Sequence, residues 1–329
     1  MKQEFVVAAE EAGQRLDRYL AARIPELSRT RVQELIAAAL VRVDGNAVKG
    51  SHKLRGGERV EIEAQPRPAL RAEPEPIPLD VLYEDDDLLV VNKPAGMTVH
   101  AGAGGAAGTL VNALLGRGQP LSTGGSPLRP GIVHRLDRQT SGAIVVAKKD
   151  FAHARLAAAF QRRKVAKTYI ALVEGSLPRK SGRIELAVGR DPRRRERMTA
   201  RRDVAGQARP ARTDWRALAS FGGCTLVEVQ LHTGRTHQAR VHFAALRHPV
   251  VGDTLYGAAK QERVGKIVLP ELGRNFLHAA RLSFQHPRSK QPVEVRAPLP
   301  GELRDYLLEL ATAAGRDPAD VDAALGAYL

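Results

Sequence analysis

The sequence has only one cysteine, Cys224, among its 329 residues. It can therefore form no internal disulfide, and it offers no cysteine cluster that could hold a metal ion. It also lacks any apolar run that approaches the length of a membrane-spanning helix, and residues 1–20 lack the apolar core of a signal peptide. These absences favour a reducing, cytoplasmic compartment and argue against a membrane partner.

Acidic residues are also in short supply, because 36 Asp and Glu stand against 51 Lys and Arg and leave a net charge of +15. Residues 1–65 carry 11 basic and 10 acidic residues, so nearly all of the excess lies in the rest of the chain. Residues 150–210 alone carry 16 basic and 6 acidic residues. A block of this charge favours a polyanionic partner, most simply a nucleic acid.

A proline-rich segment divides the chain. Residues 63–78 contain five prolines and almost no apolar periodicity, which indicates an extended, semi-rigid linker. We expect a small α+β domain over 1–65, the linker over 66–79, a larger domain over 80–310 and a carboxy-terminal tail over 311–329.

Two helices followed by a small hairpin are expected in residues 1–65. The second helix, over 28–40, would have Ser28 as its N-cap, and Arg29 and Arg31 would project from its first turn. Its buried face would be formed by Val32, Leu35, Ile36, Ala39 and Leu40. This arrangement resembles the S4 type of RNA-binding module, which implies that Arg29 and Arg31 contact RNA.

After the linker, β-branched runs dominate, and the fewer helical patterns do not alternate regularly with them. This favours an α+β fold with a mixed, largely antiparallel sheet rather than a doubly wound fold. The glycine-rich residues 101–108 lack the Lys-Ser/Thr pair of a P-loop, so we expect a mobile loop there.

The stretch GIVHRLDRQTSGAIVV, residues 131–146, predicts two strands joined by a short polar loop. Its only carboxylate, Asp137, lies between Arg135 and Arg138. Positive neighbours favour the ionised form of a carboxyl group, and a loop between rigid strands holds a reactive side chain in place. From these residues alone, Asp137 is a base, a metal ligand or a covalent nucleophile.

A second polar cluster lies in LHTGRTHQARVHFAALRHP, residues 231–249. It predicts a strand followed by a helix that Thr236 caps. Arg235 would lie at the corner between them, where its guanidinium can reach a distant carboxylate.

Two other kinds of site are not expected. His237 and His242 are five residues apart, a poor spacing for a metal on one helix face, and no neighbouring carboxylate completes a site. Ser141 lies in no nucleophile motif, so a serine–histidine–aspartate triad is not expected either.

Four motifs together resemble the RluA family of RNA pseudouridine synthases: NKPAGMTVH, HRLDRQTSG, KVAKTYIALVEG and LHTGRTHQARVH. They occur in the family's order over about residues 80–300, and with the S4-like domain the chain is most similar to the RluD type. The resemblance implies the pseudouridine synthase fold and an isomerisation that needs no metal and no other cofactor. The uridine C1′–N1 bond is broken, the uracil is turned, and the base is rejoined through C5.

The resemblance also assigns roles to individual residues. Asp137 would be the nucleophile, and the sequence leaves open whether it attacks the sugar C1′ or the base C6. Tyr169 is the candidate for stacking on the target uracil and for assisting removal of the C5 proton. Arg235 would pair with Asp137, while Arg135, with His134 beside it, would hold the flipped nucleotide.

The RluD-type resemblance implies an RNA partner, namely 23S rRNA in the large ribosomal subunit or its precursor, with uridines of the helix 69 stem-loop as the targets. We expect the protein to act as a monomer. Seven arginines within residues 190–202 predict a phosphate clamp beside the catalytic cleft. Arg193, Arg194 and Arg195 would form its centre. Two alternatives stay open: a non-catalytic RNA-binding or ribosome-assembly factor with this fold, and a hydrolase acting on RNA or a nucleotide.

Overall fold

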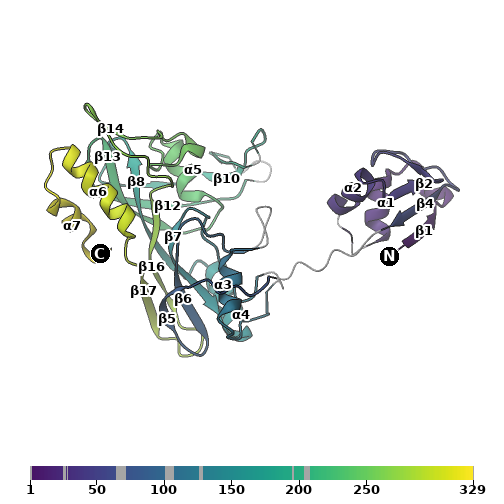
Figure 1. Ribbon diagram of the computed structural model, residues 1–329, viewed down its shortest axis with the longest axis horizontal. Helices are drawn as coiled ribbons and strands as arrows, with labels where there is room; N and C mark the ends of the chain where they lie inside the picture. Colours follow the sequence, from purple (N-terminus) through teal and green to yellow (C-terminus); the bar gives the residue numbers. More distant parts are fainter. Residues whose placement is uncertain are drawn as a thin grey trace. The chain divides into compact units, whose positions relative to one another are not determined.

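The computed structural model describes residues 2–24, 27, 29–63, 72–100, 107–125, 129–194, 196–203 and 208–328. The chain divides into two compact units, Met1–Leu70 and Arg71–Leu329, each with its own hydrophobic core (Figure 1). Most of the glycine-rich loop expected at 101–108 lies outside the described residues, as do residues 66–71 of the expected linker.

In the first unit, a four-stranded antiparallel sheet packs against two helices. The strand order is β1 (Lys2–Val6), β4 (Arg59–Glu63), β2 (Val41–Val43) and β3 (Asn46–Ala47). The helices are α1 (Leu16–Arg23) and α2 (Arg29–Ala37), and a short 3-10 helix, η1 (Ala9–Glu11), precedes them. The core between sheet and helices is almost completely buried and includes Leu16, Tyr19, Leu20, Val32, Leu35, Val60 and Ile62.

The end of α2 differs from the expectation. Val32, Leu35 and Ile36 are buried as predicted, but the helix ends at Ala37. Ala39 has a left-handed backbone with φ of 57°, and Leu40 is 37% exposed. Because the chain turns away to start β2, these two residues leave the apolar face that a continuous helix would have given them. The expected N-cap, Ser28, lies outside the described residues.

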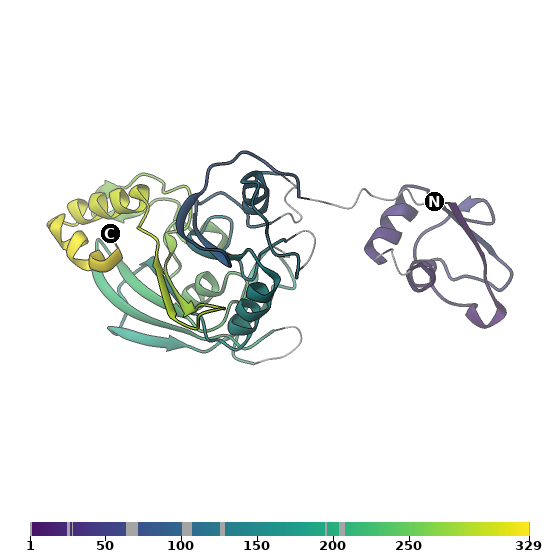
Figure 2. The same ribbon diagram turned by 90° about the horizontal axis from the view of Figure 1, so that it is seen from below.

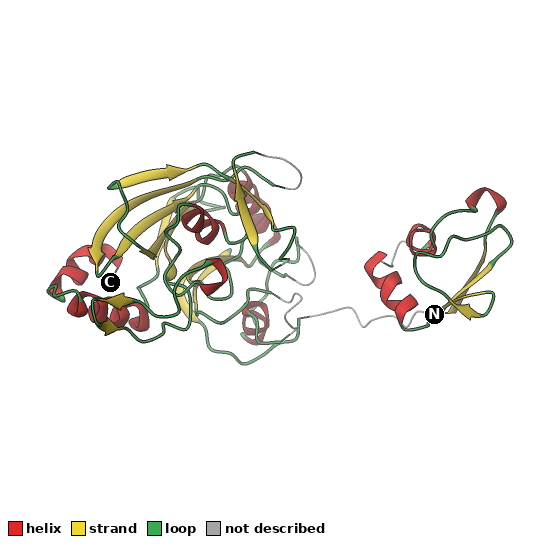
Figure 3. Ribbon diagram, turned by 90° about the horizontal axis from the view of Figure 1, so that it is seen from above, coloured by secondary structure: helices red, strands yellow, loops and turns green. Residues whose placement is uncertain are grey.

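In the second unit, a nine-stranded mixed sheet forms the framework (Figures 2 and 3). Its strands lie in the order β5 (Asp80–Glu84), β6 (Leu88–Lys93), β7 (Ser141–Ala147), β16 (Leu277–Gln285), β8 (Ala166–Glu174), β13 (Cys224–Leu231), β12 (Thr213–Phe221) and β9 (Ser181–Ile184), and β17 (Pro292–Arg296) pairs with β16. Only the β7–β16 pair is parallel among these described strands. The predicted α+β class with a largely antiparallel sheet is confirmed.

Two small hairpins and five helices surround this sheet. The hairpins are β10 (Ala187–Arg190) with β11 (Met198–Arg201), and β14 (Arg263–Val264) with β15 (Ile267–Val268). The helices are α3 (Leu110–Gly116), α4 (Asp150–Gln161), α5 (Gln238–Ala245), α6 (Gly301–Ala313) and α7 (Ala319–Leu325), with 3-10 helices η2 (Thr254–Tyr256) and η3 (Gly326–Tyr328).

Strand β7 is buried on both faces, which explains its continuous apolar sequence. Ile144 and Val146 belong to the main core, whereas Val145 and Ala147 pack in a second cluster with Leu156 of α4. The strand therefore cannot slip by one residue without exchanging its two buried faces. This fixes the end of the loop that leads into it.

The carboxy-terminal residues are part of the domain. Residues 311–329, expected as a tail, include α7, whose Val321 and Leu325 are buried in the main core. They lie four residues apart and so share one helix face. Helices α6 and α7 lie side by side at one edge of the unit (Figures 1 and 2). No helix among the described residues is long and apolar enough to cross a membrane.

Candidate active site

Residues 131–140 form the loop that leads into β7. The Ala147 N–H donates to the Gly131 carbonyl at 2.8 Å, and a single bridge joins Ile132 to Val146. The first of the two predicted strands is thus reduced to one bridge, while the second is β7. Gly131 has φ of 72°, and a Cβ there would lie 2.6 Å from the Ala147 carbonyl oxygen, so the close approach requires glycine.

His134 fastens this loop to the framework. The Val145 N–H donates to His134 Nε2 at 3.0 Å, and the imidazole stacks on Phe160 of α4 with ring centroids 4.4 Å apart. Burial, with a smaller contribution from the charge of Lys167, lowers the pKa of His134 to about 3. The ring is therefore neutral and holds the loop in place, and its predicted contact with RNA stays a prediction.

Asp137 lies in the turn just before β7. Its side chain is 16% exposed and accepts a charged hydrogen bond from Arg240 Nη1 at 3.4 Å. Its sequence neighbours Arg135 and Arg138 are exposed, and Arg138 Nε donates to the Gly96 carbonyl instead. The structure thus gives Asp137 a partner from 103 residues away and not the predicted Arg235.

Arg240 is fixed by groups other than Asp137. Its Nε and Nη2 donate to the two carboxylate oxygens of Asp253 at 2.6 and 2.8 Å, and the Asp253 side chain is only 2% exposed. The guanidinium carbon lies 5.0 Å from the ring centroid of Tyr256. A bidentate pair of this kind sets the orientation of the guanidinium plane, and so the third donor is aimed at Asp137.

The start of α5 explains why Arg240, and not Arg235, reaches the carboxylate. Thr236 does not cap the helix; His237 precedes it with a left-handed backbone, φ 55°, and no side-chain cap. This turn leaves Arg235 half-buried, with Nε donating to the Pro210 carbonyl at 3.3 Å. Arg240 lies in the first turn of the helix and is buried.

Tyr256 connects this corner to the β10–β11 hairpin. Its hydroxyl accepts from the Met198 N–H at 2.9 Å and also forms a hydrogen bond with His237 Nδ1 at 2.7 Å. The Arg197 guanidinium lies 5.3 Å from the Tyr256 ring, and Arg240 stacks on the same ring. The end of the hairpin next to its connecting turn is therefore anchored at the active site.

The predicted phosphate clamp lies on this hairpin. Arg193 and Arg194 are exposed, and their backbone N–H groups donate to Asp191 Oδ1 at 2.8 and 3.1 Å. Arg195 lies outside the described residues. The two described arginines thus extend from a turn that Asp191 stabilises, close in sequence to the anchor at Arg197.

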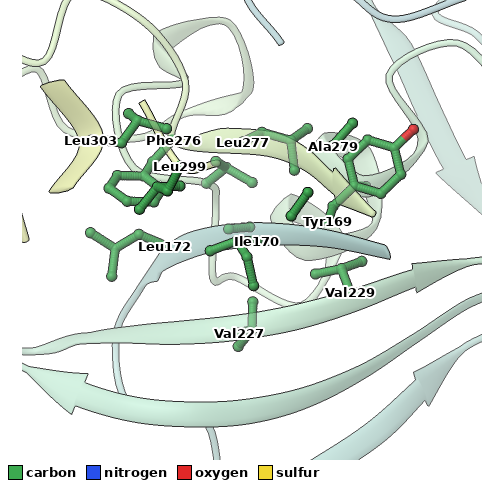
Figure 4. Packing of buried hydrophobic residues seen from close by; sticks show 14 of the residues in the cluster. Tyr169, Ile170, Leu172, Val227, Val229, Phe276, Leu277, Ala279, Leu299 and Leu303 are labelled. Carbon is green, nitrogen blue, oxygen red and sulfur yellow. The ribbon is translucent and has the colours of Figure 1, made fainter. Parts of the chain in front are cut away.

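Tyr169 lies on β8 at the border between the main core and the pocket, and it is 7% exposed. Figure 4 shows its ring beside Ala279, with the hydroxyl oxygen directed away from the apolar side chains of β8 and β13. Burial, and to a lesser extent the charge of Asp137, raise the pKa of Tyr169 well above its usual value. The hydroxyl therefore keeps its proton at neutral pH.

Asp137, Tyr169 and Arg240 line one narrow pocket, and Arg235 lies on its wall. Thr140 lines the same pocket with a buried hydroxyl that has no hydrogen-bond partner among the described residues. An unpaired buried hydroxyl costs free energy that a polar group of a ligand would recover. The pocket thus offers one carboxylate, one aromatic face and one free hydroxyl.

Lys93, at the end of β6, braces the loops around the pocket. It is fully buried, and its Nζ donates to the carbonyls of Pro94, Met97 and Arg138 at 2.7, 2.9 and 3.3 Å. The Gly96 N–H also donates to the Arg138 carbonyl at 2.8 Å. The loop after β6 and the loop of Asp137 are therefore fixed to each other.

In the first unit, Arg29 forms an ion pair with the buried carboxylate of Asp17. Asp17 is completely buried and accepts from Arg15, Arg29 and Gln33, with the Arg29 Nη2 contact at 2.8 Å. Hydrogen bonds, that from Arg15 first, hold the pKa of Asp17 well below its usual range. The side chain of Arg31 lies outside the described residues. The RNA contacts of Arg29 and Arg31 stay predictions.

One histidine of the second cluster, His242, has a structural role. His242 is fully buried between the Thr213 hydroxyl, at 2.8 Å, and the Leu186 carbonyl, at 3.0 Å. In the part of the chain that the structure describes, no three His, Cys, Asp or Glu side chains come together as a metal site would require.

Sequence reasoning missed Arg240, Lys93, Asp253 and Tyr256. Arg240 lies inside the motif LHTGRTHQARVH, but Arg235 of the same motif was predicted in its place. Lys93 lies inside the motif NKPAGMTVH, where no residue was given a role. Asp253 and Tyr256 follow in an ordinary turn, and only the tertiary structure brings them to Arg240.

Comparison with known proteins agrees with this geometry. Residues 87–245 match the RNA pseudouridylate synthase family, and residues 14–60 match the S4 domain. An uncharacterized RNA pseudouridine synthase of Chloroflexus aurantiacus is 47% identical over 314 residues, which cover 93% of this chain and 92% of the relative. Ribosomal large subunit pseudouridine synthase D of Xanthomonas campestris is 42% identical over 312 residues, covering 93% and 92%.

A solved structure shares the fold of the second unit. Human RNA Pseudouridylate Synthase Domain Containing 1 is 31% identical, with a TM-score of 0.52 over 67% of this chain and 83% of the human chain. The family match contains the whole loop of Asp137, strand β8 with Tyr169 and the start of α5 with Arg240. The chain is therefore a member of the RNA pseudouridine synthase family, with an S4 domain at its amino-terminal end.

Proposed function

We propose that this protein isomerises uridine to pseudouridine in 23S rRNA, in the helix 69 stem-loop, with Asp137 as the nucleophile. The observation that carries the role of Asp137 is that no other acidic side chain lines the pocket among the described residues. The large-subunit names of several relatives support the choice of ribosomal RNA. The S4 domain and the basic second unit support binding of a folded RNA.

The reaction follows from what the pocket provides. The target uridine must leave its stack, because its C1′ and C5 atoms are not accessible inside folded RNA. Asp137 then attacks C1′ or C6 and the C1′–N1 bond breaks. A C1′–C5 bond forms, and the bond between Asp137 and the nucleotide breaks again. The C5 proton is lost and N1 gains a proton, so the reaction balances without an oxidant, a reductant or water.

Arg240 and Tyr169 have distinct tasks in this scheme. Arg240 pairs with Asp137 and aims its carboxylate, because Asp253 fixes the guanidinium from the opposite side. Tyr169 presents a ring for the uracil to stack on, and its protonated hydroxyl suits hydrogen bonding rather than proton abstraction as a phenolate. Thr140 offers its unpaired hydroxyl to a polar atom of the nucleotide.

Further contacts would hold the RNA around this pocket. Arg135 is exposed at the mouth, where it can occupy the space that the flipped nucleotide leaves or bind its phosphate. Arg193 and Arg194 would bind phosphates farther along the RNA, from the hairpin that Tyr256 anchors.

The test is pseudouridine mapping of 23S rRNA from cells that lack this protein and from the same cells carrying wild-type protein or Asp137→Asn. We expect the helix 69 modification to disappear in the deletion, to return with wild type and to stay absent with Asp137→Asn. The amide is nearly isosteric with the carboxylate but is no nucleophile, so binding of the purified variant to the stem-loop should change little.

Two outcomes contradict the proposal. Wild-type turnover by Asp137→Asn would remove Asp137 from the chemistry. A ribosome-assembly defect that Asp137→Asn repairs fully, with unchanged pseudouridine in the deletion, would favour the non-catalytic assembly factor.

A further inference from the structure

A second cavity adjoins the catalytic pocket and has no part in the chemistry described above. It encloses about 490 Å³ between the end of α4, strand β8 and the turn after β13. Arg135, Tyr169 and Arg235 line both spaces, so the two adjoin along these side chains. We call this second space the outer cavity.

Positive charge converges on the outer cavity without a matching carboxylate. Arg163, Lys167 and Arg209 line it in addition to Arg135 and Arg235, and no acidic side chain is among its described lining residues. The only acceptor that the structure gives the Lys167 ammonium among the described residues is the Thr233 carbonyl, at 3.3 Å.

The carboxylates beside the outer cavity, Asp214 and Asp137, are already paired with other side chains. Asp214 accepts from Arg212 through both oxygens, at 3.1 and 2.6 Å, and from Arg183 at 3.1 Å. The His232 ring lies between Asp214 and the cavity and contacts Asp214 Oδ2 at 3.0 Å. Asp137, in the adjoining pocket, is paired with Arg240.

The cations of the outer cavity repel one another. Burial, with the charge of Arg163, lowers the pKa of Lys167 to about 8. Burial, then Arg209 and Arg163, lowers the pKa of Arg235 below its usual value. Such shifts reflect first the burial of these cations and then their mutual repulsion, and a bound anion would relieve both.

We infer that the outer cavity binds a phosphodiester of the RNA backbone that flanks the target uridine, through Lys167, Arg163 and Arg209. This inference rests on the proposed function, because a uridine held beside Asp137 carries one phosphodiester on each side of its sugar. Because the outer cavity adjoins the catalytic pocket, one of these two phosphodiesters would lie at these cations. Arginine and lysine are the side chains that most often bind RNA and DNA phosphates.

The experiment pairs charge removal in the protein with charge removal in the RNA. Three synthetic helix 69 stem-loops are compared: one unmodified, one with a neutral methylphosphonate linkage on the 5′ side of the target uridine, and one with it on the 3′ side. The dissociation constant of each RNA is measured at fixed salt for the full-length wild type, Lys167→Met, Lys167→Arg and Arg209→Ala. Arg209 is exposed, so its substitution leaves folding intact even if Lys167→Met should not fold.

One of the two neutral linkages should weaken binding by wild type about tenfold, the loss expected for one charged hydrogen bond. The same linkage should weaken binding by Lys167→Met and Arg209→Ala less than threefold. Each variant has already lost a contact with this phosphate, so removing the phosphate charge has less left to remove. Lys167→Arg should restore the full effect of the linkage. The position of the sensitive linkage, 5′ or 3′, then identifies the phosphodiester.

Arg162→Met is the matched control. Arg162 precedes Arg163 but lines a different surface cavity with Lys164 and Gln285, so its loss removes the same charge nearby. It should lower affinity equally for all three RNAs. The inference would be overturned if the two linkages weakened binding by the same factor, and if that factor were the same in wild type, Lys167→Met and Arg209→Ala.

Turnover separates this inference from the proposed function. Wild-type protein that binds with the expected coupling but forms no pseudouridine would contradict the proposed function and leave the phosphate site in place. Normal turnover without coupling would contradict the phosphate site alone.

Discussion

Asp253 holds the guanidinium of Arg240 by two hydrogen bonds, at 2.6 and 2.8 Å, on the side that faces away from the pocket. The remaining nitrogen, Nη1, points to Asp137 at 3.4 Å. One arginine therefore joins a buried structural carboxylate to the candidate nucleophile, and its position does not depend on the nucleophile. The pocket is preorganised before a nucleotide enters it.

Replacing Arg240 by Met should reduce kcat by orders of magnitude and also destabilise the fold. The buried Asp253 would lose its partner, which costs about 3–5 kcal/mol of unfolding free energy. Urea unfolding and single-turnover assays on the stem-loop measure the two effects. Arg235→Met, which leaves the Asp137 pair intact, should reduce kcat less. The reverse order would mean that Arg235 pairs with Asp137 once RNA is bound.

Tyr169→Phe should retain RNA affinity but impair product formation, and Tyr169→Ala should impair both. Stacking on a base contributes about 1–3 kcal/mol and survives in Phe, whereas the hydroxyl does not. Dissociation constants and single-turnover rates of the two variants separate these roles. Identical behaviour of Phe and Ala would refute distinct roles for ring and hydroxyl.

Replacing Arg193, Arg194 and Arg195 together by Ala should weaken binding to every RNA tested, with little change of rate at saturating RNA. Each lost phosphate contact should flatten the plot of log affinity against log salt by about 0.7 for single-stranded RNA. We therefore expect the slope to fall by about one to two units. An unchanged slope would return the hairpin turn to an ordinary solvated surface.

Acid should destabilise the second unit through His278. This side chain is fully buried, its Nδ1 lies 2.9 Å from Ser141 Oγ and its Nε2 3.1 Å from the Ala297 carbonyl. Burial lowers its pKa from 6.5 to about 4. Between pH 6.5 and 4, His278 is therefore protonated in the unfolded chain but neutral in the folded chain. The stability that this group contributes above pH 6.5 is lost as the pH falls to 4.

Through His278, the free energy of unfolding should fall by about 3 kcal/mol between pH 7 and pH 4. His134 acts in the same direction. Urea unfolding of wild type and His278→Gln between pH 7 and 4 measures this fall, with the slope against pH as the readout. Equal slopes for the two proteins would exclude His278 as the group responsible.

The sequence was most informative where local pattern decides structure. The apolar run of residues 141–147 predicted β7, and the loop before it placed Asp137 at the end of a buried strand. The partner of Asp137 could not be read in this way. Arg235 and Arg240 belong to one motif, and the choice between them depends on the left-handed backbone of His237, which turns one arginine outward and the next inward.

The end of α2 in the first unit also depends on contacts that the local pattern does not show. The apolar spacing of residues 32–40 suits a longer helix than α2, yet the helix stops at Ala37. The turn into β2 is required by the pairing of β2 with β4, whose partner residues lie about twenty positions farther along the chain. Such pairing is invisible to helix periodicity, and so Leu40 becomes exposed where the pattern predicted burial.

Lys93 has a consequence for how the protein tolerates change. Its three acceptors are main-chain carbonyls, so the contact depends on the path of the backbone and not on which side chains stand at positions 94, 97 and 138. As far as this contact is concerned, those positions are free to vary in residue type. An insertion or deletion of one residue in either loop would instead carry a carbonyl out of reach of the ammonium, so these loops are constrained in length more than in composition.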